Sequence, residues 1–217
     1  MSSDTAGFVR AQTAIAAPPL VPEIRLHLAS EVTPLWHATE ARLARQQLPP
    51  PYWAFAWAGG QALARYLLDH RDIVAGRDAL DFGAGSGVVA IAALKSGARC
   101  ATAAELDPFA LAAIALNASL NGVAVAIEPS DVIGRAEAPW SVILVGDMCY
   151  ERPLAERLTA WLRDEARRGA TVLLGDPGRA YLPKTGLTEL ARYAVPTPLD
   201  LEDRAERIGV VWRLEPA

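Results

Sequence analysis

From about residue 60 to the C-terminus, short uninterrupted apolar runs alternate with longer segments of helical periodicity. Such runs are typical of strands that are covered on both faces, and the segments between them carry the turn and capping residues of helices. Strands that alternate with helices at this spacing predict parallel βαβ units with right-handed crossovers. We therefore expect an α/β fold in which helices cover both faces of a mostly parallel sheet.

The boundaries of the elements follow from the same pattern. Gly60 to His70 is expected to be helical, because Leu63, Tyr66 and Leu67 would share one face. Further helices are expected at 86–97, 108–121 and 153–167, and strands at 78–82, 99–106, 123–129, 140–147 and 170–176. The last expected elements are a short helix at 183–190 and an antiparallel pair of strands at 190–197 and 205–215.

Residues 1–51 form a mixed region that prolines divide into short pieces. Residues 21–30 alternate apolar and polar side chains, as a short strand does, and residues 38–47 are compatible with one or two helical turns. Apolar residues recur throughout the region. We therefore expect an N-terminal extension, residues 1–51, that packs on a main domain, residues 52–217.

Composition narrows the class of protein. Apolar residues make up 52% of the 217-residue chain, which is enough for a sizeable core. A net charge of −4 gives no basic field for non-specific nucleic-acid binding, and no apolar stretch predicts a membrane span. Cys100 and Cys149 are too few for a disulfide framework, and the three histidines suggest no metal site. The N-terminus lacks a secretory pattern, and we expect a cytoplasmic monomer.

A glycine-rich turn, Asp81-Phe82-Gly83-Ala84-Gly85-Ser86-Gly87, lies where a predicted strand ends and a helix begins. Ligands of open α/β sheets bind at this edge, where glycines allow a close approach and a helix N-terminus attracts negative charge. The G-x-G-x-G spacing differs from that of dinucleotide sites, and no Walker lysine follows. A tight turn without a ligand is the alternative.

Two acidic residues follow the next strand ends. Glu105, 24 residues after Asp81, could accept both hydroxyls of a ribose, and Asp131 could meet the edge of an adenine. Asp107 is better explained as the cap of the helix that begins at Pro108. A solvated strand end and an ordinary loop aspartate are the alternatives for Glu105 and Asp131.

Together these features resemble the seven-strand S-adenosylmethionine-dependent methyltransferases: DFGAGSG is similar to their first motif and ELDP to their ribose-binding strand end. The resemblance implies a Rossmann-like seven-strand sheet with an antiparallel C-terminal hairpin. It also implies S-adenosylmethionine as cofactor. The cofactor-binding residues that it suggests are Asp81, Gly83, Gly85, Ser86, Glu105 and Asp131.

The segment GDMCYE places Asp147 and Tyr150 after the fourth strand, and this spacing resembles the D-x-x-Y motif of a lysine-methylating branch of that fold. By this resemblance both residues would be catalytic. A carboxylate can accept the hydrogens of an amine and orient its lone pair, and an aromatic face tolerates developing ammonium charge. Capping of the following helix is the alternative.

The stretch PYWAFAWAGGQAL at 51–63 is similar to one in the electron-transfer-flavoprotein β-subunit lysine methyltransferases. VPEIRLHL, GDMCYE and DPGR at 176–179 are similar to the same group, so the resemblance covers about residues 20–215. It implies that Trp57 and Gln61 border the cofactor and that the substrate is the flavoprotein β-subunit. A ribosomal-protein or small-molecule amine N-methyltransferase, and a non-catalytic binding module, are the alternatives. Glu105 stands where many relatives have aspartate.

Overall fold

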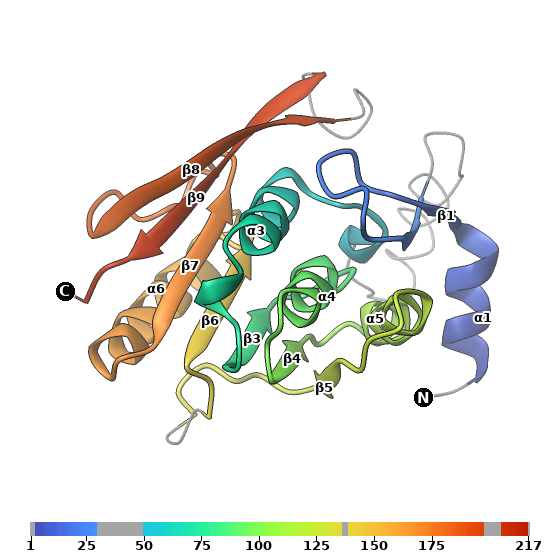
Figure 1. Cartoon of the computed structure of the whole chain (residues 1–217), viewed down its shortest axis with the longest axis horizontal. Helices are drawn as coiled ribbons and strands as arrows, with labels where there is room; N and C mark the ends of the chain where they lie inside the picture. Colours follow the sequence, from blue (N-terminus) through green and yellow to red (C-terminus); the bar gives the residue numbers. More distant parts are fainter. Residues whose placement is uncertain (1–2, 30–49, 136–138, 198–204, 217) are drawn as a thin grey trace.

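A seven-strand mixed sheet forms the middle layer of the computed structural model, which describes residues 3–29, 50–135, 139–197 and 205–216 (Figure 1). Its order is β5-β4-β3-β6-β7-β9-β8. The strands are β3 (Asp78–Phe82), β4 (Cys100–Ala104), β5 (Ala126–Glu128), β6 (Val142–Gly146), β7 (Thr171–Asp176), β8 (Leu187–Pro196) and β9 (Glu206–Leu214). The pairs among β3 to β7 are parallel, and β9 runs antiparallel to β7 and β8, which confirms the predicted fold class.

Helices cover both faces of this sheet. The helices beside the sheet are α3 (Ala58–Asp69), α4 (Val88–Lys95), α5 (Pro108–Leu120) and α6 (Arg152–Arg167) (Figure 1). The first three lie in front of the sheet in this view, and α6 lies behind it. Two apolar cores result, one around Leu63, Ile91 and Leu144, and the other around Ile143 and Trp161.

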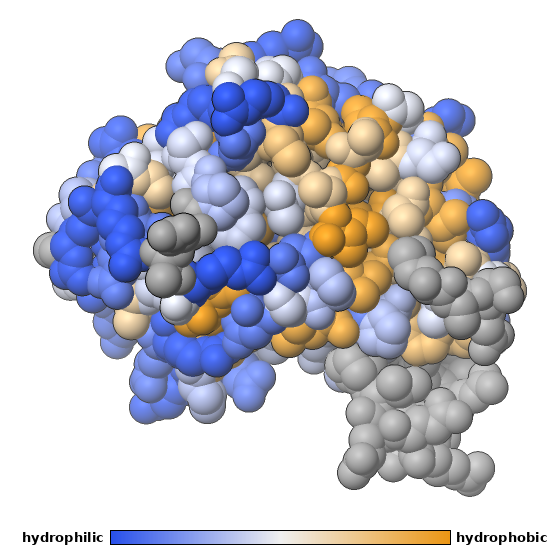
Figure 2. Space-filling model, turned by 90° about the horizontal axis from the view of Figure 1, so that it is seen from below, coloured by the Kyte–Doolittle hydropathy of each residue, from blue (hydrophilic) through white to orange (hydrophobic). Residues whose placement is uncertain are grey.

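The amphipathic pattern predicted for residues 153–167 is confirmed in α6. Leu158, Trp161 and Leu162 are buried against the sheet, while Arg157 and Arg167 face outward. Figure 2 shows the molecule from below: hydrophilic residues gather on its left side, and hydrophobic residues gather toward the middle and right. The left side is where α6 and the β8–β9 hairpin lie in Figure 1, so this end of the molecule presents mainly polar surface.

The start of α5 follows the predicted capping. Asp107 Oδ1 accepts a hydrogen bond from the backbone N–H of Phe109 at 2.8 Å, and Pro108 occupies the first turn. Both features favour a helix beginning at this point. Because β4 ends at Ala104, the strand end and the helix start face the same edge of the sheet.

Helix α3 lies directly on β7, with glycine on both sides of the contact. A Cβ atom on Gly59 would overlap the carbonyl oxygen of Gly175, and a Cβ on Gly175 would overlap the carbonyl oxygen of Gly59. This contact brings the N-terminus of α3 beside the residue that follows β6. The backbone N–H of Gly60 consequently reaches Asp147 Oδ2 at 2.8 Å.

Residues 3–29 pack on the main layers through elements that the sequence pattern did not fully reveal. They form α1 (Ser3–Gln12) and a small antiparallel pair, β1 (Ala14–Ala16) with β2 (Leu26–Leu28); of these, the pattern predicted only a strand at 21–30. Val9 packs in one cluster with Trp53 and α5. The fully buried Asn117 accepts a hydrogen bond from His27 N and donates one to Ser86 O, at 2.7 and 2.8 Å. This region is therefore tied to the glycine turn.

The expected short helix at 183–190 is wrong. Residues 184–186 form bends, and β8 begins at Leu187 opposite Leu214 of β9. Pairing with β9 continues along β8 to Pro196, apart from a register shift between Glu189 and Ala191, whereas an isolated short helix is only marginally stable. The helical turns expected at 38–47 lie outside the described residues. Within the part of the chain that the structure describes, no helix combines the length and the apolar character needed to cross a membrane.

Candidate active site

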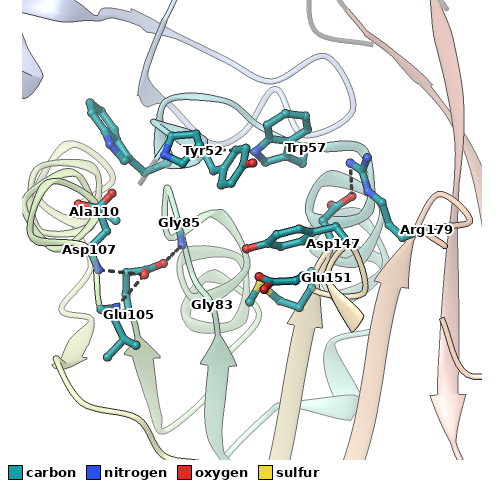
Figure 3. Close-up of a pocket in the computed structure, with 16 residues that line it drawn as sticks. Tyr52, Trp57, Gly83, Gly85, Glu105, Asp107, Ala110, Asp147, Glu151 and Arg179 are labelled. Carbon is teal, nitrogen blue, oxygen red and sulfur yellow. Dashed lines mark hydrogen bonds and ion pairs between the residues drawn. The ribbon is translucent and has the colours of Figure 1, made fainter. Parts of the chain in front are cut away.

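A cavity of about 520 Å³ opens at the carboxyl ends of β3, β4 and β6 (Figure 3). Tyr52 and Trp57 lie across it from the strand ends in this view. Its lining residues are Pro50, Tyr52, Trp53, Trp57, Gly83, Gly85, Glu105, Leu106, Asp107, Ala110, Gly146, Asp147, Met148, Tyr150, Glu151 and Arg179. Six of the ten predicted site residues are among them: Trp57, Gly83, Gly85, Glu105, Asp147 and Tyr150.

The glycine turn forms one wall of the cavity. Gly83 and Gly85 have φ values of 65° and 52°, a backbone region that side-chain-bearing residues rarely adopt. A Cβ on Gly83 would overlap the side chain of Met148. A Cβ on Gly85 would meet no heavy atom closer than the Cα of Trp53 at 3.8 Å, so it would occupy space now open to a ligand.

Glu105 is held rigidly beside this turn. Its Oε2 accepts a hydrogen bond from Gly85 N at 3.0 Å, and its Oε1 accepts from Leu106 N and Asp107 N at 2.7 and 3.2 Å. A carboxylate has about four acceptor sites, so after these three bonds one site remains for a hydroxyl donor in the cavity. The backbone therefore orients Glu105 before any ligand arrives.

Asp81 and Ser86 lie beneath the turn and do not line the cavity. Asp81 is buried, its Oδ2 accepts from Ala90 N at 2.9 Å, and burial raises the pKa of its carboxyl to about 7. Ser86 is also buried, and its carbonyl oxygen accepts the hydrogen bond from Asn117. In this arrangement both residues support the turn from inside.

Gln61 and Asp131 are also absent from the cavity wall. Gln61 is buried: its Nε2 donates to Ala56 O at 2.6 Å, and its Oε1 accepts from Leu20 N at 3.2 Å. Asp131 pairs with Arg157 at 2.6 Å on the surface. Beyond Glu105, the cavity is lined by Leu106, which is 63% exposed, and by Asp107 and Ala110.

Asp147 lies at the opposite end of the cavity from Glu105 (Figure 3). Its φ is +58°, a strained value for a residue with a side chain, and its N–H donates to Gly175 O at 2.9 Å. Its Oδ2 accepts from Gly60 N at 2.8 Å, and its Oδ1 pairs with Arg179 Nη2 at 3.1 Å. Burial raises the pKa of this carboxyl to about 6, while the charge of Arg179 opposes the rise.

Aromatic rings surround this end of the cavity. The Tyr52 ring centroid lies 5.9 Å from that of Trp57 and 5.7 Å from that of Tyr150, both in edge-on geometry. Trp57 Nε1 donates to Tyr52 O at 2.8 Å, which fixes the indole. Burial raises the pKa of the Tyr150 hydroxyl. The cluster presents ring faces near the Asp147 carboxylate, a combination suited to a cationic or amine-bearing ligand.

Several residues that line the cavity were not predicted from the sequence to be site residues. The main ones are Arg179, Tyr52 and Leu106. Arg179 belongs to the DPGR segment, whose position directly after a buried strand was the available signal. Tyr52 lies in the aromatic stretch that pointed to Trp57. Leu106 follows Glu105, and its exposure is visible only in the folded chain.

The glycine turn, the acidic strand end and the order of this sheet agree with the S-adenosylmethionine-dependent methyltransferase class that the sequence motifs resemble. The family model described as Ribosomal protein L11 methyltransferase (PrmA) matches residues 61–145. The solved magnesium protoporphyrin IX methyltransferase from Synechocystis PCC 6803 has the same fold, with a TM-score of 0.50 and 13% identity over 70% of this chain and 80% of that one.

Curated relatives share a higher sequence identity with this chain than that solved structure does, and over more of its length. The electron transfer flavoprotein beta subunit lysine methyltransferase of Xenopus laevis is 39% identical over 96% of this chain and 86% of its own length. That of Danio rerio is 40% identical over 89% of this chain and 76% of its own length. The chain belongs to the electron transfer flavoprotein beta subunit lysine methyltransferase family.

Proposed function

We propose that this protein transfers methyl groups from S-adenosylmethionine to lysine side chains of the electron transfer flavoprotein β-subunit. The observation that carries the proposal is the end of the cavity formed by Asp147, Tyr150 and Trp57, where a buried carboxylate lies beside aromatic rings. The names of the curated relatives support the same acceptor.

The residues at the other end of the cavity fit the methyl donor. Glu105 would accept a hydrogen bond from a ribose hydroxyl, and the open space over Gly85 would admit the nucleoside close to the backbone. When bound, S-adenosylmethionine supplies a sulfonium methyl group that an amine lone pair attacks in line, so that a C–N bond forms as the C–S bond breaks. Asp81, Ser86 and Gln61 would act indirectly, by supporting the turn and the aromatic segment.

The acceptor amine must be neutral to attack, although free lysine has a pKa near 10.4. Asp147 would accept hydrogen bonds from the amine and turn its lone pair toward the methyl group. Tyr150 and Trp57 would offer ring faces to the positive charge that develops on nitrogen. With its pKa of about 6, the Asp147 carboxyl is mostly ionised at neutral pH and can act in this way.

A long side chain of a folded protein can reach this end of the cavity. Tyr52 and Tyr150 both line the cavity and are 40% and 43% exposed, so they mark a mouth between solvent and Asp147. We propose further that the protein is cytoplasmic and acts as a monomer. The free thiols Cys100 and Cys149 support the compartment alone, because free cysteines are typical of a reducing environment.

The test is methyl transfer from labelled S-adenosylmethionine to three separate acceptors: the flavoprotein β-subunit, ribosomal protein L11 and free lysine. The Asp147→Asn variant measures background labelling. We expect label on the flavoprotein subunit, located on lysine by peptide mass spectrometry. Labelling of only one of the other acceptors, or equal labelling of wild type and variant, would refute the proposal.

A further inference from the structure

Arg179 reaches into the cavity from a segment that neither the methyl donor nor the acceptor has so far required. It follows β7 and lies 32 residues beyond Asp147 in the chain. Its Nη2 is 3.1 Å from Asp147 Oδ1, and its Cζ lies over the Trp57 ring at 5.5 Å from the centroid (Figure 3). The guanidinium therefore joins the carboxylate to the aromatic cluster.

The loop after β7 is built to deliver this side chain. Asp176 Oδ1 accepts hydrogen bonds from Gly178 N at 2.7 Å and Arg179 N at 2.6 Å, and Gly178 has a φ of 92°. These bonds bend the chain back across the end of β6, since Gly175 lies opposite Gly146 in the sheet. Arg179 therefore approaches Asp147 from a fixed backbone.

The surroundings of Asp147 would otherwise disfavour its charge. Asp147 is 8% exposed, and the like charge of Asp176 adds to the effect of burial. Cys149, on the same turn, is a buried thiol whose pKa is raised to about 12, so it stays neutral and brings no compensating charge. Helix α3 contributes only the backbone N–H of Gly60. Among the described groups that influence Asp147, Arg179 is the one cationic side chain.

We propose that Arg179 is a positioning residue for methyl transfer, which keeps Asp147 ionised and turned toward the acceptor amine. This inference rests on the proposed function in assuming that the acceptor is an amine. Arginine suits the role better than lysine, because its planar guanidinium can pair with a carboxylate and lie over an indole at once. A lysine at this position would keep the charge but lose that geometry.

Direct titration of Asp147 tests the inference without any acceptor. Carbon NMR of protein labelled at the aspartate carboxyl carbons follows each titration, and the Asp147 signal is assigned by its loss in Asp147→Asn. In Arg179→Gln we expect the pKa of Asp147 to rise by about 1–3, the usual effect of an adjacent opposite charge. Arg179→Lys should give a smaller rise.

A matched control is Arg157→Gln, which breaks the pair with Asp131 on the surface outside the cavity and should leave the Asp147 titration unchanged. Circular dichroism and the thermal midpoint establish that each variant is folded. An unchanged Asp147 titration in folded Arg179→Gln and folded Arg179→Lys would overturn the inference. So would an equal rise in the Arg157→Gln control.

Kinetics then separate this role from a structural one. In Arg179→Gln, the acidic limb of kcat/KM should move to higher pH. Because the pKa of Asp147 starts at about 6, a rise of one unit should lower the rate at pH 7 about twofold and a rise of two units about tenfold. The rate should recover once the pH lies well above the raised pKa. The same fractional loss at every pH would contradict the inference. If the flavoprotein subunit is not methylated at all, the proposed acceptor fails, while the carboxyl titration still decides the role of Arg179.

Discussion

The two ends of the cavity are built by different means. At the end that we propose for the methyl donor (the donor end), Glu105 is oriented by backbone N–H groups from residues 85, 106 and 107. At the end that we propose for the amine (the acceptor end), Asp147 is oriented by Gly60 N and by the side chain of Arg179, from separate segments. The donor end thus depends mainly on local backbone geometry, whereas the acceptor end depends on charge pairs and ring contacts across the fold.

This difference suits the two ligands. A donor of fixed structure can be met by a rigid turn, and backbone groups keep their positions whatever the pH. An acceptor that must give up a proton requires groups whose charge and orientation are set by their neighbours. Variants at the two ends should therefore separate binding of the donor from the rate of transfer.

The largest effect on the rate of methyl transfer is expected at the acceptor end. Asp147→Asn removes the negative charge that would orient the amine, and kcat should fall by about 100- to 10,000-fold. The affinity for S-adenosylmethionine should be unchanged, because Asp147 lies opposite the Glu105 end (Figure 3). Steady-state kinetics and calorimetry together measure the contrast. A large loss of donor affinity with normal kcat would reverse the assignment of the two ends.

At the donor end, Glu105→Gln replaces a charged acceptor of hydroxyl and backbone N–H groups with a neutral amide. Hydrogen bonds to charged groups contribute about 1.5–3 kcal/mol, so the Kd for S-adenosylmethionine should rise by about 10- to 100-fold. The loss of kcat at saturating donor should be far smaller than in Asp147→Asn. Calorimetry measures the Kd for S-adenosylmethionine, and an unchanged Kd would show that Glu105 does not bind the donor.

The contact between α3 and β7 offers a structural test of the acceptor end. Gly59→Ala places a methyl group against Gly175 O and within 2.6 Å of Asp147 Oδ2, and overpacking of this kind costs about 1–3 kcal/mol. Urea unfolding should show the loss, together with reduced kcat. Gly60→Ala is the matched control in the same helix, since its Cβ would meet only Val88 Cγ1 at 3.6 Å. Equal destabilisation by both variants would contradict the steric explanation.

The last prediction concerns the pH dependence of stability beneath the glycine turn. The pKa of Asp81 is about 7 in the folded protein against a usual 3.8, so between these values the native state binds more protons than the unfolded state. The free energy of unfolding should therefore fall as pH rises through this window, by at most about 1.4 kcal/mol per pH unit for this one carboxyl. Asp81→Asn should flatten that slope in urea titrations at several pH values.

Asp78, at the other end of β3, is the control, because its pKa is shifted in the opposite direction to that of Asp81. Its pair with Arg99 lowers its pKa, so its contribution to stability is present above pH 3.8 and is lost as pH falls through the lower, folded-state value. Asp78→Asn should leave the slope between pH 4 and 7 unchanged. If Asp78→Asn flattened the dependence of stability on pH between pH 4 and 7, Asp81 would not be the source of that dependence.

The sequence predicted those parts of the molecule that local patterns determine. The strand at 78–82, the Asp107 cap and the Gly83–Gly85 turn all follow from residues close together in the chain. The role of Gln61 did not follow in this way, because its amide bonds Leu20 and Ala56, a contact that exists only after folding. The pairing of Asp147 with Arg179 requires β6 and β7 to be neighbours with their ends in register. Neither periodicity nor spacing supplies that information.

The Gly59–Gly175 contact limits where the protein can adapt to a different acceptor. Backbone lies against backbone there, so neither glycine can carry a side chain without a clash. We expect changes of acceptor size to be accommodated by residues 50–57 instead, where the Tyr52 side chain is 40% exposed at the cavity. Efforts to redirect this enzyme toward new amines should begin with those residues and leave the glycine pair intact.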